Sequence, residues 1–218
     1  FLHDWMVVTL KKPVLKGRVM YAEFKRFAAD SSLLRMERTR NLLANMLEYA
    51  KYYAAIKGVA AAGSGDMNVD RRLESIQKLV STVTDPLVMD MFAAWKRDRV
   101  SCDGLLRMLA DLESYLFRRM ICSVSSNGLN KLVPSLIAKL ESAEHDLVET
   151  FAALLLTETA KATRMPTDEQ FRQALLGEDL YRPAPRCKYL LAGLENHNHP
   201  KDPRSFSEYT VEHIMPQN

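Results

Sequence analysis

The sequence predicts a mainly α-helical protein, a multi-helix bundle whose chain ends in one short β-strand. Through most of the chain, apolar residues recur every three or four positions, which is the spacing of one face of an α-helix. Strand-like alternation of side chains is confined to residues 209–215, and Pro216 follows it. With 218 residues, 47% of them hydrophobic, the chain is long enough to bury a substantial core.

The first half of the chain carries several signals for the ends of helices. Residues 5–10 fit a short strand and a helix end equally well, and the next helix starts near Tyr21. Gly58 is expected to end a long helix, because glycine readily takes the left-handed conformation that closes helices. Pro86 fits the first turn of a later helix. The glycine-rich loop at 58–68 lacks the Gly-Lys-Ser/Thr ending of a phosphate-binding loop.

The second half contains the helix expected to be the longest, which starts at Ser101 or Asp103 and for which Asn127-Gly128 is the expected stop and turn. Thr167 and Gln170 have the spacing of a capping box, which marks a helix start. The remaining helices are expected at 129–140, 147–155, 167–177 and 185–196.

Composition restricts the class of protein. A net charge of +3 and a pI near 8.7 permit contact with nucleic acid without requiring it. The three cysteines are far apart and form no CxxC pair, which argues against a zinc knuckle and a disulfide framework. No signal peptide and no apolar run of about 18 residues is visible, so we expect a cytoplasmic protein without a membrane partner.

The residues with catalytic chemistry lie at the end of the chain, in residues 209–217 (YTVEHIMPQ). In a strand, Glu212 and His213 point to opposite faces. A neutral imidazole can accept a proton from water, and a carboxylate is a hard oxygen ligand for Mg²⁺. Phosphodiester hydrolysis needs such a base and such a cation. A bare Glu-His pair, taken without its neighbours, favours a solvated surface strand.

The whole string resembles the first strand of the HNH (ββα-metal) nuclease motif, and specifically the DUF1524 nuclease domain. That domain usually follows a DUF262 domain in GmrSD-type, modification-dependent (type IV) restriction systems and in phosphorothioate-sensing defence nucleases. The resemblance implies a DNA endonuclease or nickase that uses Mg²⁺ or Mn²⁺, with His213 as the general base and Glu212 as the acid on the metal side. Many HNH nucleases have aspartate in place of Glu212.

A second point of resemblance is the block at 117–131, which is similar to the Arg-Arg, Asn-Gly, Asn-Lys arrangement of DUF1524-type proteins. It makes Arg118, Arg119 and Lys131 candidates for contacts with DNA phosphates. Adjacent helical residues point about 100° apart, so one arginine could anchor a buried carboxylate while the other contacts phosphate. The alternative is a set of helix-end charges with one structural salt bridge.

The resemblance further implies three regions. Residues 1–60 would hold the end of a DUF262-type region and connecting helices, 61–183 a helical body, and 184–218 the start of an HNH-like nuclease core. The second strand and the ligand helix would lie beyond Asn218, so we expect these 218 residues alone to be inactive. DNA is the expected substrate, an upstream DUF262 NTPase or sensor domain is the expected partner, and no nucleotide is expected to bind here. A different reading stays open, in which the chain is a non-catalytic helical module that binds DNA or a partner and couples a sensor to an effector.

Overall fold

The computed structural model describes residues 1–29, 35–59, 63–79, 82–181, 184–199 and 208–211. All regular structure in these residues is helical, which confirms the predicted mainly α class. The helices are α1 (Leu2–Leu10), α2 (Arg18–Ala29), α3 (Arg35–Ile56), α4 (Met67–Lys78), α5 (Asp85–Lys96), α6 (Cys102–Ile121), α7 (Leu129–Glu141), α8 (Leu147–Thr157), α9 (Asp168–Gly177) and α10 (Ala184–Asn198), with short 3-10 turns at Thr82–Thr84 and Ser126–Gly128.

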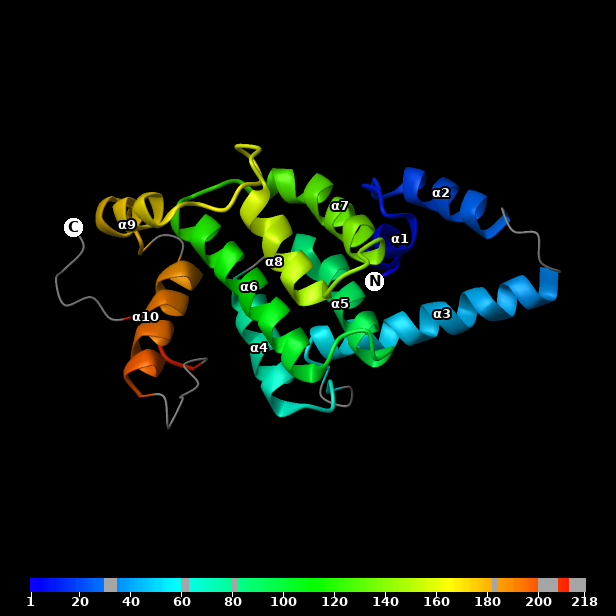
Figure 1. Cartoon of the computed structure of the whole chain (residues 1–218), viewed down its shortest axis with the longest axis horizontal. Coiled ribbons are helices and arrows are strands. Elements are labelled where there is room, and N and C mark those ends of the chain that lie inside the picture. The colour runs from blue at the N-terminus through cyan, green and yellow to red at the C-terminus, as the bar shows by residue number, and fades with distance from the viewer. Residues whose placement is uncertain (30–34, 60–62, 80–81, 182–183, 200–207, 212–218) are drawn as a thin grey trace.

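Helix α5 forms the centre of the bundle (Figure 1) and packs against α1, α3, α6 and α7. Its side chains are buried around most of the helix, which is why its sequence is apolar with little periodicity. One hydrophobic core extends from Trp5 to Leu155 and so includes residues on both sides of position 60. The division at 60 therefore stays a prediction about family relationship and does not separate two cores.

The ambiguous start of the chain is helical. Four consecutive residues of α1, Trp5 to Val8, are buried, because the helix is covered on more than one side by α5 and α7. The Trp5 indole donates a hydrogen bond to Asn45 Oδ1 at 2.9 Å, and its ring lies against Phe24 and Phe27 with centroids at 6.3 and 5.8 Å. Burial on several faces removes the alternation that would have distinguished helix from strand in the sequence.

Most of the predicted helix signals are confirmed. Gly58 has φ 65° and follows the end of α3, and the capping box between Thr167 and Gln170 is formed at the start of α9. Ser101 caps α6, and Pro86 lies in the first turn of α5. The expected helix at 129–140 is α7, and the apolar residues that recur along it at helical spacing are all buried: Leu129, Leu132, Val133, Leu136, Ile137 and Leu140.

Three details were predicted wrongly. Helix α6 has 20 residues, whereas α3 has 22 and is the longest described helix. The left-handed residue after α6 is Ser123, with φ 52°, so the chain turns before Asn127-Gly128. The spacing of apolar residues predicts that Leu43 shares the buried face of α3 with Leu42 and Met46, but Leu43 is 59% exposed and the buried face carries Tyr49. The apolar spacing of α3 fits two adjacent faces of the helix, and contacts with neighbouring helices decide which of the two faces is buried.

The two C-terminal helices, α9 and α10, lie at one end of the molecule, while α2 and the start of α3 lie at the other (Figure 1). Residues 209–211, the described part of the predicted terminal strand, have no regular secondary structure. The rest of that strand, including Glu212 and His213, lies outside the described residues. None of the helices that the structure describes is long and apolar enough to cross a membrane.

One carboxyl group in the bundle should make folding stability depend on pH. Burial raises the pKa of Asp90 from 3.8 to about 6; Glu141 adds to the effect, and Arg99 is the largest opposing charge. Because the folded protein holds this proton where the unfolded chain has lost it, stability falls as the pH rises from about 4 to about 6. Asp90→Asn removes the penalty, so we expect a gain of about 2–3 kcal/mol at neutral pH and none below pH 4.

Urea denaturation of wild type and Asp90→Asn at several pH values checks this expectation. Glu144→Gln, at an exposed position in the link between α7 and α8, is the control and should leave the pH dependence unchanged. Equal stability of Asp90→Asn and wild type at neutral pH would contradict the assignment.

Candidate functional site

The C-terminal half of α6 holds both C-terminal helices. The Phe117 ring packs edge-on against Phe171 of α9, with centroids 5.6 Å apart, and lies tilted against Tyr189 of α10 at 5.3 Å. Each aromatic pair of this kind contributes about 0.5–1.5 kcal/mol beyond the apolar area that it buries. Phe117 is therefore a shared apolar contact for the two helices that lead to the end of the chain.

Arg119 is almost fully buried, at 3% exposure, and its partners are backbone carbonyls. Its Nη2 donates to Ser125 O at 2.7 Å and to Ala162 O at 2.9 Å, and Nη1 donates to Arg164 O at 3.4 Å. The guanidinium thus joins the link after α6 to the loop that leads from α8 to α9. The sequence suggested a buried carboxylate as a partner, and it gave no sign of this arrangement because carbonyl groups are common to all residues.

Arg118 points elsewhere and is half-buried. Its Nη2 forms an ion pair with Asp168 Oδ1 at 2.6 Å, and Nη1 donates to Pro166 O at 3.3 Å. The guanidinium also lies over the Phe171 ring, 5.3 Å from its centroid. Since Asp168 is the first residue of α9, Arg118 fixes the point where that helix begins. The two adjacent arginines diverge as helical geometry requires.

The loop before α9 makes two more close contacts with the body. The Tyr115 hydroxyl donates to Thr163 O, and burial raises the pKa of Tyr115 to about 12, so the hydroxyl remains a donor at neutral pH. A Cβ atom at Gly128 would lie 2.7 Å from Ala162 O and 2.8 Å from Thr163 Cγ2. Gly128 has an ordinary negative φ, so close approach of the loop is what requires a glycine here.

Gly128→Ala should therefore destabilise the protein by about 1–3 kcal/mol, because a backbone carbonyl must move to make room for the methyl group. Gly193→Ala is the control: Gly193 lies inside α10, and a methyl group added there meets no neighbouring atom within 4 Å, so alanine should stabilise by about 0.5–1 kcal/mol. Chemical denaturation should show a lower free energy of unfolding for Gly128→Ala and a higher one for Gly193→Ala. A neutral Gly128→Ala would contradict the close packing of the loop.

Glu113 connects three helices and was not singled out from the sequence. Its carboxylate accepts hydrogen bonds from Arg72 of α4 and from the Tyr189 hydroxyl of α10. Burial, and then the bond to Glu113, raises the pKa of Tyr189. A signal was present: Glu113 follows Leu109 by four residues, which places an acid on the buried face of α6 and predicts a charged partner.

Arg186 fastens the start of α10 to the end of α6, and it too was missed. This side chain is 6% exposed, and its Nη1 donates to Ser123 Oγ at 3.2 Å and to Met120 O at 3.5 Å. Its Nη2 donates to Asp179 O, just after α9. Together with Glu113 and the two arginines of α6, Arg186 gives the C-terminal helices a defined position on the body.

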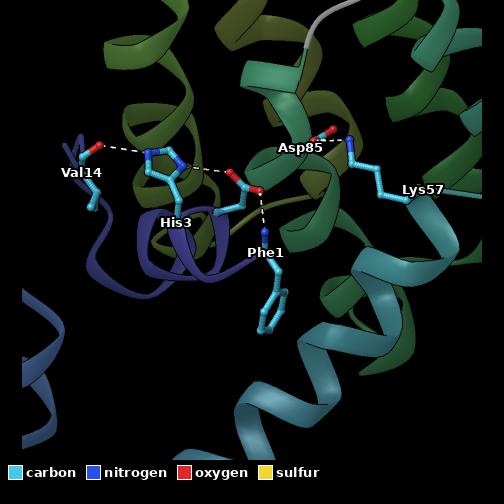
Figure 2. A network of polar contacts seen from close by, with 6 residues as sticks. Phe1, His3, Val14, Lys57 and Asp85 are labelled. Carbon is cyan, nitrogen blue, oxygen red and sulfur yellow. Dashed lines mark hydrogen bonds and ion pairs between the residues drawn. The ribbon is translucent and has the colours of Figure 1, made fainter. Parts of the chain in front are cut away.

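A separate polar cluster lies at the beginning of the chain (Figure 2). His3 contacts Asp4 Oδ1 through Nδ1 and Val14 O through Nε2, each at 2.9 Å, and Lys57 pairs with Asp85. These groups border a cavity of about 560 Å³ between α1, α3, α5 and α7. Each of them already has a partner: the contact of His3 with Val14 O holds the loop after α1, and the Lys57–Asp85 pair joins the end of α3 to the start of α5.

The predicted catalytic pair is not placed by this structure, because Glu212 and His213 lie outside the described residues. Lys131 is described and is exposed on α7. Within the described residues, no three His, Cys, Asp or Glu side chains converge to hold a metal ion. The expectation of Mg²⁺ or Mn²⁺ near Glu212 therefore stays a prediction.

Comparison with known families identifies the segment that α6 holds. Residues 165–218 match the model of the family described as GmrSD restriction endonucleases, C-terminal domain. This segment is GmrSD-like. It begins three residues before α9, ahead of the boundary predicted at 184, and includes α9, α10, Glu212 and His213. No curated protein and no solved structure matches the chain.

The GmrSD-like match confirms the resemblance predicted from the terminal string. The contacts of Arg118, Phe117, Glu113 and Arg186 are therefore contacts between the helical body and a GmrSD-like segment. A DUF262 relationship for the upstream residues remains a prediction.

Proposed function

We propose that this chain belongs to a metal-dependent DNA endonuclease or nickase of a modification-dependent restriction or phage-defence system. One observation carries the proposal: residues 165–218, which include Glu212 and His213, match the C-terminal domain of the GmrSD restriction endonucleases. In this proposal an upstream DUF262 domain senses the DNA and binds nucleotide, and the protein acts in the cytoplasm on DNA.

His213 carries out the proton transfer. Its neutral imidazole takes a proton from a water molecule, whose oxygen attacks the phosphorus while the bond to the leaving oxygen breaks. Imidazole suits this step because its ordinary pKa lies near neutral pH. A divalent cation, Mg²⁺ or Mn²⁺, held in part through Glu212, supplies charge stabilisation to the phosphate when bound.

The helical body supplies the position from which this segment acts. Phosphate binding by Arg119 would require its guanidinium to leave three carbonyl groups, so we assign Arg119 to positioning. Lys131 is exposed and stays a candidate for a phosphate contact, as does Arg118 if its ion pair with the 84% exposed Asp168 opens.

Cleavage of matched modified and unmodified duplexes in Mg²⁺, by the protein as its gene encodes it, tests the proposal. We expect strand cleavage, faster on the modified DNA. Binding of DNA without cleavage of either substrate would favour the non-catalytic helical module, and neither binding nor cleavage would reject both functions.

A further inference from the structure

We propose that Lys161 and Arg164 form a phosphate-binding edge for double-stranded DNA, directly before the GmrSD-like segment. They lie in the loop between α8 and α9, residues 158–166, which we call the α8–α9 loop. The inference rests on the proposed nuclease function and adds two DNA-contacting residues that the sequence did not suggest.

The α8–α9 loop has a fixed shape. Glu158 Oε1 accepts hydrogen bonds from Ala160 N at 3.0 Å and from Thr163 Oγ1 at 2.9 Å. The backbone N–H groups of Thr163 and Arg164 donate to Ala160 O at 2.9 and 2.8 Å. The loop therefore forms a closed turn through its own hydrogen bonds, before any contact with the body is considered.

The inner side of the loop faces α6. Three successive carbonyls, of residues 162, 163 and 164, accept hydrogen bonds from Arg119 and Tyr115. The loop runs beside the link between α6 and α7 (Figure 1, yellow beside green). The backbone of the loop is thus used for contacts with α6, while the side chains of Lys161 and Arg164 are exposed.

Both cations are available for an external anion. Within the part of the chain that the structure describes, neither Lys161 nor Arg164 takes part in an ion pair, whereas the nearby Arg118 is paired with Asp168.

The position of acidic groups limits where a phosphate can bind. Lys161 and Arg164 line one wall of a groove of about 690 Å³, and Glu169 and Glu178 of the α9 region line it as well. These carboxylates repel a phosphate inside the groove. The geometry points to the outer edge of the loop, where the two cations are exposed, as the place of contact.

A rigid loop that presents two cations suits a DNA backbone. Binding costs less when the backbone is already ordered, because only the side chains must then be immobilised. Each phosphate neutralised by lysine or arginine releases condensed counterions, so the contact must appear in the salt dependence of binding.

The test measures binding of a fluorescein-labelled duplex by fluorescence anisotropy at several salt concentrations, in EDTA so that cleavage does not interfere. Lys161→Glu/Arg164→Glu should weaken binding at low salt about ten-fold or more. The slope of log Kd against log salt should fall by about 2, since each lost phosphate contact contributes about 0.9.

The control is Arg40→Glu/Lys51→Glu, which makes the same change of charge at exposed positions of α3, away from the loop (Figure 1). It should keep the wild-type slope. If both double variants lose binding equally, net charge explains the effect and the proposed edge is overturned. The proposed edge is also overturned if neither double variant loses binding.

Folding and function are separated by two further readouts. Lys161→Gln/Arg164→Gln removes the two charges without reversing them. It should lose less DNA affinity than the double glutamate variant and keep the thermal unfolding curve of the wild type. Unchanged DNA affinity in this variant would overturn the edge. If wild type binds duplex DNA and all loop variants bind as well as wild type, only this inference fails. If wild type binds no duplex DNA, the proposed nuclease function fails with it.

Discussion

His213→Ala is expected to reduce the single-turnover rate of DNA cleavage by about 10²–10⁴-fold, which is the usual contribution of a positioned general base. The substitution removes the group that takes the proton from the attacking water and leaves the contacts of the helical body unchanged. Binding of DNA should change little, because the proton is transferred only during the chemical step. The loss should therefore appear in the rate constant for cleavage rather than in the affinity.

His199→Ala provides the matched control for this variant. His199 follows α10, its side chain is 55% exposed, and it pairs with Glu195 at 3.4 Å, so removing it should leave cleavage unchanged. If His213→Ala cleaves as fast as wild type, the base has been assigned wrongly. If both histidine variants lose activity equally, the effect is not specific to His213.

Arg119→Ala is expected to lower the free energy of unfolding by about 3–5 kcal/mol, because it leaves the carbonyls of residues 125, 162 and 164 without their charged donor. The donor is charged and only 3% exposed, and hydrogen bonds to charged groups contribute more than neutral ones, so losing all three makes this variant severe. The α8–α9 loop should also become accessible to protease, since Arg119 ties it to α6. Urea denaturation and limited proteolysis measure the two effects.

The neighbouring residue supplies the comparison. Arg118→Ala removes an ion pair with the exposed Asp168, the hydrogen bond to Pro166 O at the end of the loop and the contact with the Phe171 ring, so it should cost about 1–2 kcal/mol and leave residues 158–164 protected. A similarly small loss of stability in Arg119→Ala would show that the three carbonyls find other donors. Arg119 would then not be needed to hold the C-terminal segment.

The helices were predictable from the sequence wherever one face alone is buried. Helix α7 shows this well, because every apolar position expected from its spacing is buried. Helix α1 was ambiguous because neighbours cover it on several sides, and the exposed Leu43 was misassigned because its apolar spacing fits two faces of α3. In both cases the deciding information is which helices lie nearby, and local spacing does not contain it.

The contacts that hold the candidate site were harder to predict. Arg119 binds carbonyls, which leave no trace in a sequence, and Arg186 reaches residues far away along the chain. Glu113 could have been found as an acid on an apolar face, although its partners Arg72 and Tyr189 could not. The family resemblance, in contrast, was readable from the terminal string and is confirmed over residues 165–218.

The most direct test of the central claim is the nicking of supercoiled plasmid by the wild-type protein, as its gene encodes it, in Mg²⁺ and in EDTA. A metal-dependent nuclease should nick the plasmid in Mg²⁺ and lose this activity by orders of magnitude in EDTA, with recovery when Mg²⁺ or Mn²⁺ is restored. Nicking that continues undiminished in EDTA, or no nicking under either condition while DNA is bound, would contradict the claim.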